Sequence, residues 1–225
     1  MNMNDKDNCL RRLISYILKY DIGEYYGLSE DCVAFYQDRA YHFSQSLRML
    51  EIRFRAIILY EDGRKLQYNS ETVPDNEELF KDSGVECIQY EICSKDAGTD
   101  FQDTIYKITH DRKLQTDEKQ LVSYMIDNGV YMNSVNGSTK LLELSYFCFG
   151  YNDSIKMVSM LQSLNIPIHG VDVYHHDDLE FGWGTESLSK DCYNETLTFI
   201  DKWSRNNRTN YSFSFVFRNI FYNMT

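Results

Sequence analysis

The hydrophobic positions in the first part of the chain change from a helical period to a strand period. An apolar stripe with spacings of three and four predicts an amphipathic helix, formed by Leu10, Leu13, Ile14, Ile17 and Leu18. Aromatic residues and leucines at mixed helical spacing predict a second helix over about residues 30–50. Residues 53–60 form a β-branched, apolar run, and the Asp-Gly pair at 62–63 predicts a tight turn into a return strand over 66–69.

Two more strands are predicted before the middle of the chain, over residues 85–93 and 101–109, with a polar loop between them. The polar stretch His110–Lys119 follows and is the best candidate for a domain boundary. The chain is therefore divided into an N-terminal α+β region of unknown role, residues 1–112, and a second region, residues 113–225. Because the polar stretch is short, the two regions are either separate domains or parts of one continuous domain.

The second region predicts a strand–helix–strand unit. A helix over 116–128 precedes a buried strand over 141–149, and Asp153 is the expected cap of the next helix. The strand over 166–174 contains Pro167 at its start, where no ladder donor is needed. A short connection of this kind predicts a parallel pair of strands with a right-handed crossover.

The C-terminal part predicts a helix followed by a strand. The apolar face of the helix is marked by Tyr193, Leu197, Ile200 and Trp203. Phe213, Phe215 and Phe217 then alternate with other residues, which is typical of a strand with one apolar face. We predict an α+β fold in which a mixed β-sheet is packed by helices.

Composition limits the classes of partner. Hydrophobic residues make up 43 % of the 225 residues, which is enough to build a core, and the formal net charge is −11. No basic cluster is present, so nucleic acid and anionic membranes are not expected as partners, whereas basic partners are attracted. The alternative is that the acidity only keeps the protein soluble. The polar start and the lack of a long apolar run predict a cytoplasmic protein without a membrane anchor.

The sequence contains few patterns that suggest catalysis. The cluster His175–Asp178 has the residue types of a metal site, but a solvated turn explains it better, since neighbours on a strand point to opposite sides. His110 and Asp111 could form an acid–base pair, although a polar strand end is the better interpretation. The six cysteines form no Cys-x-x-Cys pair and are interpreted as reduced core residues. We therefore assign no catalytic, cofactor-binding or metal-binding residue.

Residues 172–186 combine acidic and aromatic side chains and are the predicted partner-binding segment. Aromatic residues are favoured as anchors of interfaces, and surrounding acids can pair with lysine and arginine of a partner. The predicted partner-binding residues are Asp172, Tyr174, Asp177, Asp178, Glu180, Trp183 and Glu186. The alternative is that Trp183 fills the local core and the acids face water.

The same part of the chain resembles immunity protein family forty of bacterial polymorphic toxin systems. The resemblance covers about residues 120–205 and rests on Ile166-Pro167-Ile168, Gly170, Asp172-Val173-Tyr174, Trp183, Tyr193 and Ile200. The family pattern has a second glycine where this chain has Val171, and an apolar residue where it has His169.

The resemblance implies an immunity protein that binds and neutralises a cognate secreted toxin, which is expected to be a basic protein such as a nuclease. It implies inhibition by stoichiometric occlusion and no enzymatic activity. Two other interpretations remain open at this point: a small hydrolase with a His/carboxylate site, and a protein-interaction module unrelated to toxins.

Overall fold

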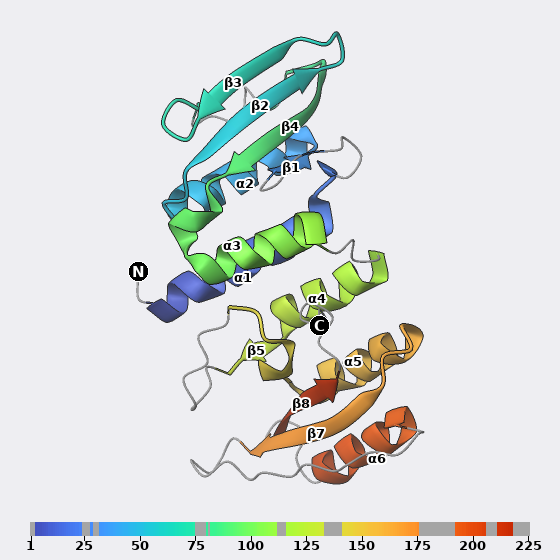
Figure 1. Cartoon of the computed structure of the whole chain (residues 1–225). Coiled ribbons are helices and arrows are strands. Elements are labelled where there is room, and N and C mark those ends of the chain that lie inside the picture. The colour runs from blue at the N-terminus through green and yellow to red at the C-terminus, as the bar shows by residue number, and fades with distance from the viewer. Residues whose placement is uncertain are drawn as a thin grey trace. The chain divides into compact units, whose positions relative to one another are not determined.

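The computed structural model describes residues 3–23, 28, 32–74, 80, 82–111, 116–132, 141–175, 192–205 and 211–217. The chain forms two compact units, Met1–Leu114 and Gln115–Thr225. Each unit contains helices packed on a four-stranded sheet, which confirms the α+β class (Figure 1). All strand pairs of the described residues are antiparallel. No described helix has the length and apolar character needed to cross a membrane.

The first unit is built on a sheet with the strand order β1-β4-β2-β3. Its elements are α1 (Met3–Tyr20), β1 (Cys32–Phe35), α2 (Gln37–Met49), β2 (Phe54–Tyr60), β3 (Lys65–Asn69), β4 (Val85–Ile92), the 3-10 helix η3 (Ser94–Ala97), α3 (Thr99–Tyr106) and the π-helical turn η4 (Lys107–Asp111). Figure 1 shows α1, α2 and α3 on the same side of this sheet. The predicted first helix and the β2–β3 hairpin are confirmed, and Gly63 adopts a positive φ of 84° at the hairpin turn.

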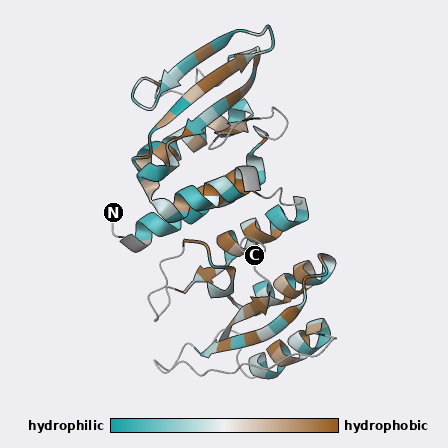
Figure 2. Cartoon of the chain, viewed as in Figure 1, coloured by the Kyte–Doolittle hydropathy of each residue, from teal (hydrophilic) through white to brown (hydrophobic). Residues whose placement is uncertain are grey.

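Aromatic side chains form the core between α1, α2 and the sheet. The Phe35 and Phe43 ring centroids lie 4.5 Å apart, and Tyr90 lies 5.1 Å from Phe43 and 5.6 Å from Phe54. Tyr90 is fully buried, and its hydroxyl donates a hydrogen bond of 2.7 Å to the Ala40 carbonyl. Brown and teal segments alternate along the helices and strands in Figure 2, because each element buries one face and exposes the other.

Two predictions for the first unit are wrong. Residues Cys32–Phe35 form a strand rather than the first turn of a helix, because all four are buried and pair with β4. Residues 101–109 form α3 and η4 rather than a strand. The buried residues of α3 are Phe101, Thr104 and Ile105, which have helical spacing. Thr104 can be buried because its hydroxyl donates to the Asp100 carbonyl at 2.7 Å.

The second unit contains a sheet with the strand order β5-β6-β8-β7. Its elements are α4 (Thr116–Asn128), β5 (Val130–Tyr131), the 3-10 helix η5 (Leu144–Tyr146), β6 (Phe147–Phe149), α5 (Tyr151–Ser163), β7 (Ile168–His175), α6 (Cys192–Ser204) and β8 (Tyr211–Phe217). Helix α6 contacts β7 and β8, and α5 contacts β6 and β8. The predicted helices α4, α5 and α6 and the strands β7 and β8 are confirmed.

The expected parallel pairing of the two strands around α5 is wrong. Strand β8 lies between β6 and β7 and is antiparallel to both, so β6 and β7 run in the same direction without touching. The strand predicted over 141–149 is limited to Phe147–Phe149. Asp153 is not the cap of α5, which begins after Gly150. Its carboxylate instead accepts a hydrogen bond of 2.6 Å from the Tyr124 hydroxyl of α4.

Candidate partner-binding surface

Two of the seven predicted partner-binding residues lie in β7. Asp172 is opposite Ser214 of β8, and Tyr174 is opposite Ser212. Because side chains alternate along a strand, Asp172 and Tyr174 share one face of the sheet. Asp177, Asp178, Glu180, Trp183 and Glu186 lie outside the described residues.

The face that carries Asp172 and Tyr174 is polar and partly closed. The Ser214 hydroxyl donates a hydrogen bond of 2.6 Å to the Ser145 carbonyl of η5. Cys148 of β6, which pairs with Ser214 across the neighbouring edge of β8, is buried. Asp172 and Tyr174 are half-buried. Both residues therefore contribute to the inner structure of the unit as well as to its surface.

Burial controls the ionisation of this face. It raises the pKa of the Cys148 thiol to about 12, with a further contribution from the charge of Asp172. It likewise raises the pKa of the Tyr174 phenol to about 12, with smaller contributions from Cys148 and Asp172. The thiol and the phenol are therefore neutral at pH 7, and Cys148 does not supply the thiolate that a cysteine nucleophile needs.

The opposite face carries an aromatic cluster at the end of β7. The His175 and Tyr211 rings are 4.9 Å apart, Tyr211 and Trp203 are 5.8 Å apart, and Trp203 and Phe199 are 6.2 Å apart. His175 and Tyr211 face each other in the β7–β8 register. Three segments distant in the sequence thus meet at this point.

We call His175, Trp203 and Tyr211 the aromatic rim. Trp203 is 38 % exposed, whereas Phe199 beneath it is buried. The sequence placed Trp203 on the apolar face of α6, but the buried face of that helix consists of Cys192, Thr196, Phe199, Ile200 and Ser204. The Trp203 indole, near the end of the helix, is therefore part of the partly exposed aromatic rim and does not fill the core.

The aromatic rim is continuous along the chain with the predicted binding segment, because His175 belongs to residues 172–186 and directly precedes residue 176. Sequence reasoning missed Trp203 and Tyr211 as surface residues. No local signal identifies them, since they meet His175 only when β7 pairs with β8. The rim can provide rigid apolar contact area for a partner, as tyrosine and tryptophan do in many interfaces.

Within neither unit do the described histidines form a cluster with other metal-ligating side chains. His42 lies on α2 of the first unit, whereas His169 and His175 lie on β7 of the second. His110 and Asp111 belong to η4, but their side chains, like His176, are outside the described part of the chain. Within that part, no group of three or more His, Cys, Asp or Glu side chains is arranged to hold a metal ion.

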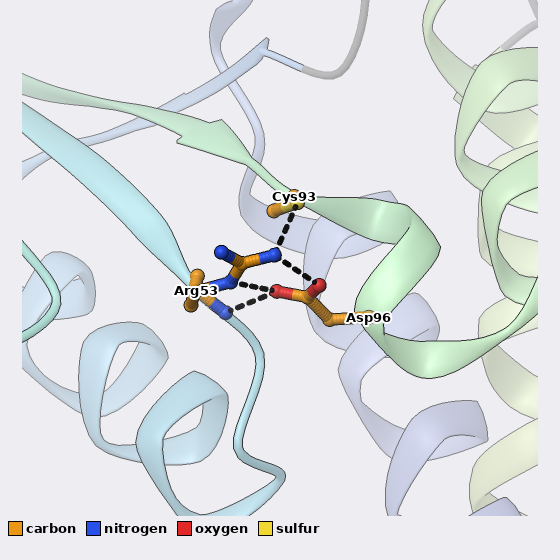
Figure 3. Close-up of polar contacts among 3 residues, drawn as sticks. All are labelled: Arg53, Cys93 and Asp96. Carbon is orange, nitrogen blue, oxygen red and sulfur yellow. Dashed lines mark hydrogen bonds and ion pairs between the residues drawn. The ribbon is translucent and has the colours of Figure 1, made fainter.

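In the first unit, an ion pair with several hydrogen bonds joins Arg53 to Asp96 (Figure 3). The Arg53 amide and Nε donate to Asp96 Oδ2 at 3.0 and 2.9 Å, and a terminal guanidinium nitrogen donates to Oδ1 at 2.8 Å. The same nitrogen lies 3.8 Å from Cys93 Sγ. The Arg53 hydrogen bond holds the pKa of the Asp96 carboxyl far below its ordinary range. Such a carboxylate is a poor general base, so this contact is best understood as a link between β2 and η3.

Comparisons with protein-family models, with curated proteins and with solved structures found no match for this chain.

Proposed function

We propose that this protein is an immunity protein that binds a cognate bacterial toxin and neutralises it by occlusion. The observation that carries the proposal is the aromatic rim, because Trp203 and Tyr211 gather there around His175, which belongs to the acidic and aromatic segment 172–186. The resemblance to immunity protein family forty involves the same part of the chain.

The charge of the protein supports a basic partner. A formal net charge of −11 accelerates the encounter with a positively charged protein and disfavours nucleic acid. A nuclease is a suitable toxin, since its substrate-binding surface must be basic in order to bind phosphates. An acidic inhibitor that covers this surface would exclude the substrate without performing any reaction.

The required affinity sets the size of the interface. A nanomolar complex corresponds to about 12 kcal/mol, and stable complexes usually bury about 1,600 Å². The three residues of the rim are too few to supply this area alone. The interface must therefore extend beyond the rim, and the acidic segment 176–186 is the adjacent sequence.

Trp203→Ala tests the rim directly. We expect this change to weaken binding to the toxin encoded by the neighbouring gene by about 30-fold, the effect of losing a central aromatic anchor. Tyr36→Ala is the matched control, since Tyr36 is an aromatic residue that is 58 % exposed and belongs to the first unit. Calorimetric titration gives the affinities, and survival on co-expression of the two genes gives the biological effect.

Three results would contradict the proposal. The first is failure of the wild-type protein to bind the toxin or to protect the cell. The second is a Trp203→Ala variant that has an unchanged unfolding midpoint and binds as tightly as Tyr36→Ala, which would remove the rim from the interface. The double variant Trp183→Ala/Glu180→Ala, if folded and fully active, would remove the acidic segment.

A further inference from the structure

The first unit contains a groove between α1 and α2 with a volume of about 200 Å³. Its lining consists of Cys9, Arg12, Leu13, Tyr16, Ser46, Met49 and Leu50. The first four follow one face of α1, Ser46 and Met49 lie near the C-terminal end of α2, and Leu50 is the C-cap of that helix. The groove therefore follows directly from the way these two helices pack.

The walls of the groove are mainly apolar. Leu13 and Leu50 are buried and form the inner part, whereas Met49 is 78 % exposed at the rim. The Tyr16 hydroxyl donates a hydrogen bond of 2.8 Å to the Arg39 carbonyl, and burial raises the pKa of Tyr16 to about 12. Tyr16 therefore offers its ring to the groove and remains neutral.

Among the described residues that line the groove, Arg12 alone is charged. It is exposed and makes no hydrogen bond or ion pair in the part of the chain that the structure describes. Its neighbour Arg11 differs, because it is buried and donates a hydrogen bond of 2.8 Å to Asn8. An unpaired guanidinium beside an apolar wall is suited to a ligand with one anionic group and an apolar body.

We propose that this groove binds a small carboxylic acid with a short alkyl chain or a single ring. The carboxylate pairs with Arg12, and the apolar part lies against Leu13, Leu50 and the Tyr16 ring. The volume supports a small ligand, since pockets for drug-sized molecules usually measure about 300–1,000 Å³. The inference is independent of the proposed toxin binding, because no residue of the second unit takes part.

A docked helix of a partner protein is less suitable for this groove. A helix in a groove needs an apolar stripe several turns long. The exposed side chains of α1 on either side of the lining include Asp5, Asn8 and Lys19, which are polar or charged. The apolar surface thus ends where the groove ends.

The cysteines provide a direct measurement in the full-length protein. Cys9 in the groove and Cys93 elsewhere in the unit are both partly exposed, whereas Cys32, Cys87, Cys148 and Cys192 are buried. We expect octanoate to slow the alkylation of Cys9 by iodoacetamide in a saturable manner and to leave Cys93 unaffected. Peptide mass spectrometry follows each thiol separately. Octan-1-ol, which has the same chain length but no charge, should protect at least about tenfold more weakly.

Two variants test the role of the cation. Arg12→Met keeps an unbranched apolar side chain and should weaken protection by octanoate about tenfold while leaving protection by octan-1-ol unchanged. Lys19→Met removes a positive charge from the same helix outside the groove and should have less than about a twofold effect, as expected for a screened surface charge. The proposal is overturned if Cys9 is unreactive in the free protein, if octanoate does not protect it, or if acid and alcohol protect equally. Equal effects of the two substitutions would also overturn it.

Discussion

Gly129, directly after α4, is the position where a single methyl group should disturb the second unit most clearly. An added Cβ would lie 2.7 Å from the Met125 carbonyl oxygen, 2.8 Å from a Phe149 ring carbon and 3.0 Å from a Phe147 ring carbon. Ordinary contacts between carbon atoms are about 3.5–4.0 Å. The neighbours cannot easily yield, because both rings are buried and the Gly129 amide is hydrogen-bonded to the Met125 carbonyl at 2.9 Å.

The expected magnitude for Gly129→Ala is a balance of two effects. Overpacking in a close-packed core typically costs about 1–3 kcal/mol. Restricting the unfolded chain by replacing glycine with alanine returns about 0.4–1 kcal/mol. We therefore expect the second unit to lose about 1.5 kcal/mol of unfolding free energy, which lowers the Tm of a unit of this size by roughly 6–10 °C.

Gly150→Ala is the matched control in the same unit. An added Cβ at Gly150 meets no atom within 4 Å, and the residue has a φ of −65° that alanine adopts without strain. Alanine is a poorer N-cap than glycine by about 0.5–1 kcal/mol, and the restriction of the unfolded chain, which stabilises by about 0.4–1 kcal/mol, offsets this loss. This variant should therefore stay within about 0.5 kcal/mol of the wild type.

Tryptophan fluorescence during urea unfolding measures both variants. The two tryptophans, at positions 183 and 203, belong to the unit Gln115–Thr225, so the signal reports on this unit. The reasoning is refuted if Gly129→Ala unfolds at the same urea concentration as Gly150→Ala. That result would mean that α4 and the phenylalanines of β6 are not packed as closely as these distances state.

Two other predictions concern the first unit. The folded-state pKa of Asp96 is lowered by Arg53, so Asp96→Asn should destabilise the unit at pH 7. The difference in unfolding free energy from the wild type should shrink as the pH falls below the ordinary carboxyl pKa of 3.8. Circular dichroism during urea unfolding at several pH values measures this difference, and a constant difference would contradict the ion pair. Glu51 has a positive φ of 58° directly after Leu50, the C-cap of α2, so Glu51→Gly should raise the unfolding free energy by about 0.5–1 kcal/mol, whereas a loss of stability would show that the side chain outweighs the strained backbone.

Much of the local structure could be predicted from the sequence because hydrophobic period determines it. The stripe of α1 and the Asp-Gly turn between β2 and β3 are local signals, and both were predicted correctly. The helix α3 was missed because Thr104, a polar residue, occupies one of its three buried positions, so the apolar residues alone do not show the helical period. Its burial depends on a hydrogen bond to the backbone carbonyl of Asp100, which the residue type alone does not reveal.

The errors in topology have a different cause. The β1 segment Cys32–Phe35 lies directly before a helix, and only its pairing with β4 makes it a strand. Likewise, the local order of β6, α5 and β7 favours a parallel pair, but β8 from the end of the chain lies between the two strands. Pairings between distant segments depend on the whole core, so no local pattern reports them.

The position of β8 also separates the candidate binding residues into two groups. Alternation along β7 places Asp172 and Tyr174 on the polar side next to Ser214, and His175 on the side of Tyr211 and Trp203. One flat partner surface cannot contact both sides of a sheet. A partner that uses the aromatic rim must therefore approach from the end of β7, where residues 176–186 begin, and Asp172 and Tyr174 then act mainly through the structure of the sheet. The sequence grouped all of these residues into one segment, whereas the strand pairing places the two predicted binding residues that the structure describes, Asp172 and Tyr174, on the face opposite the aromatic rim.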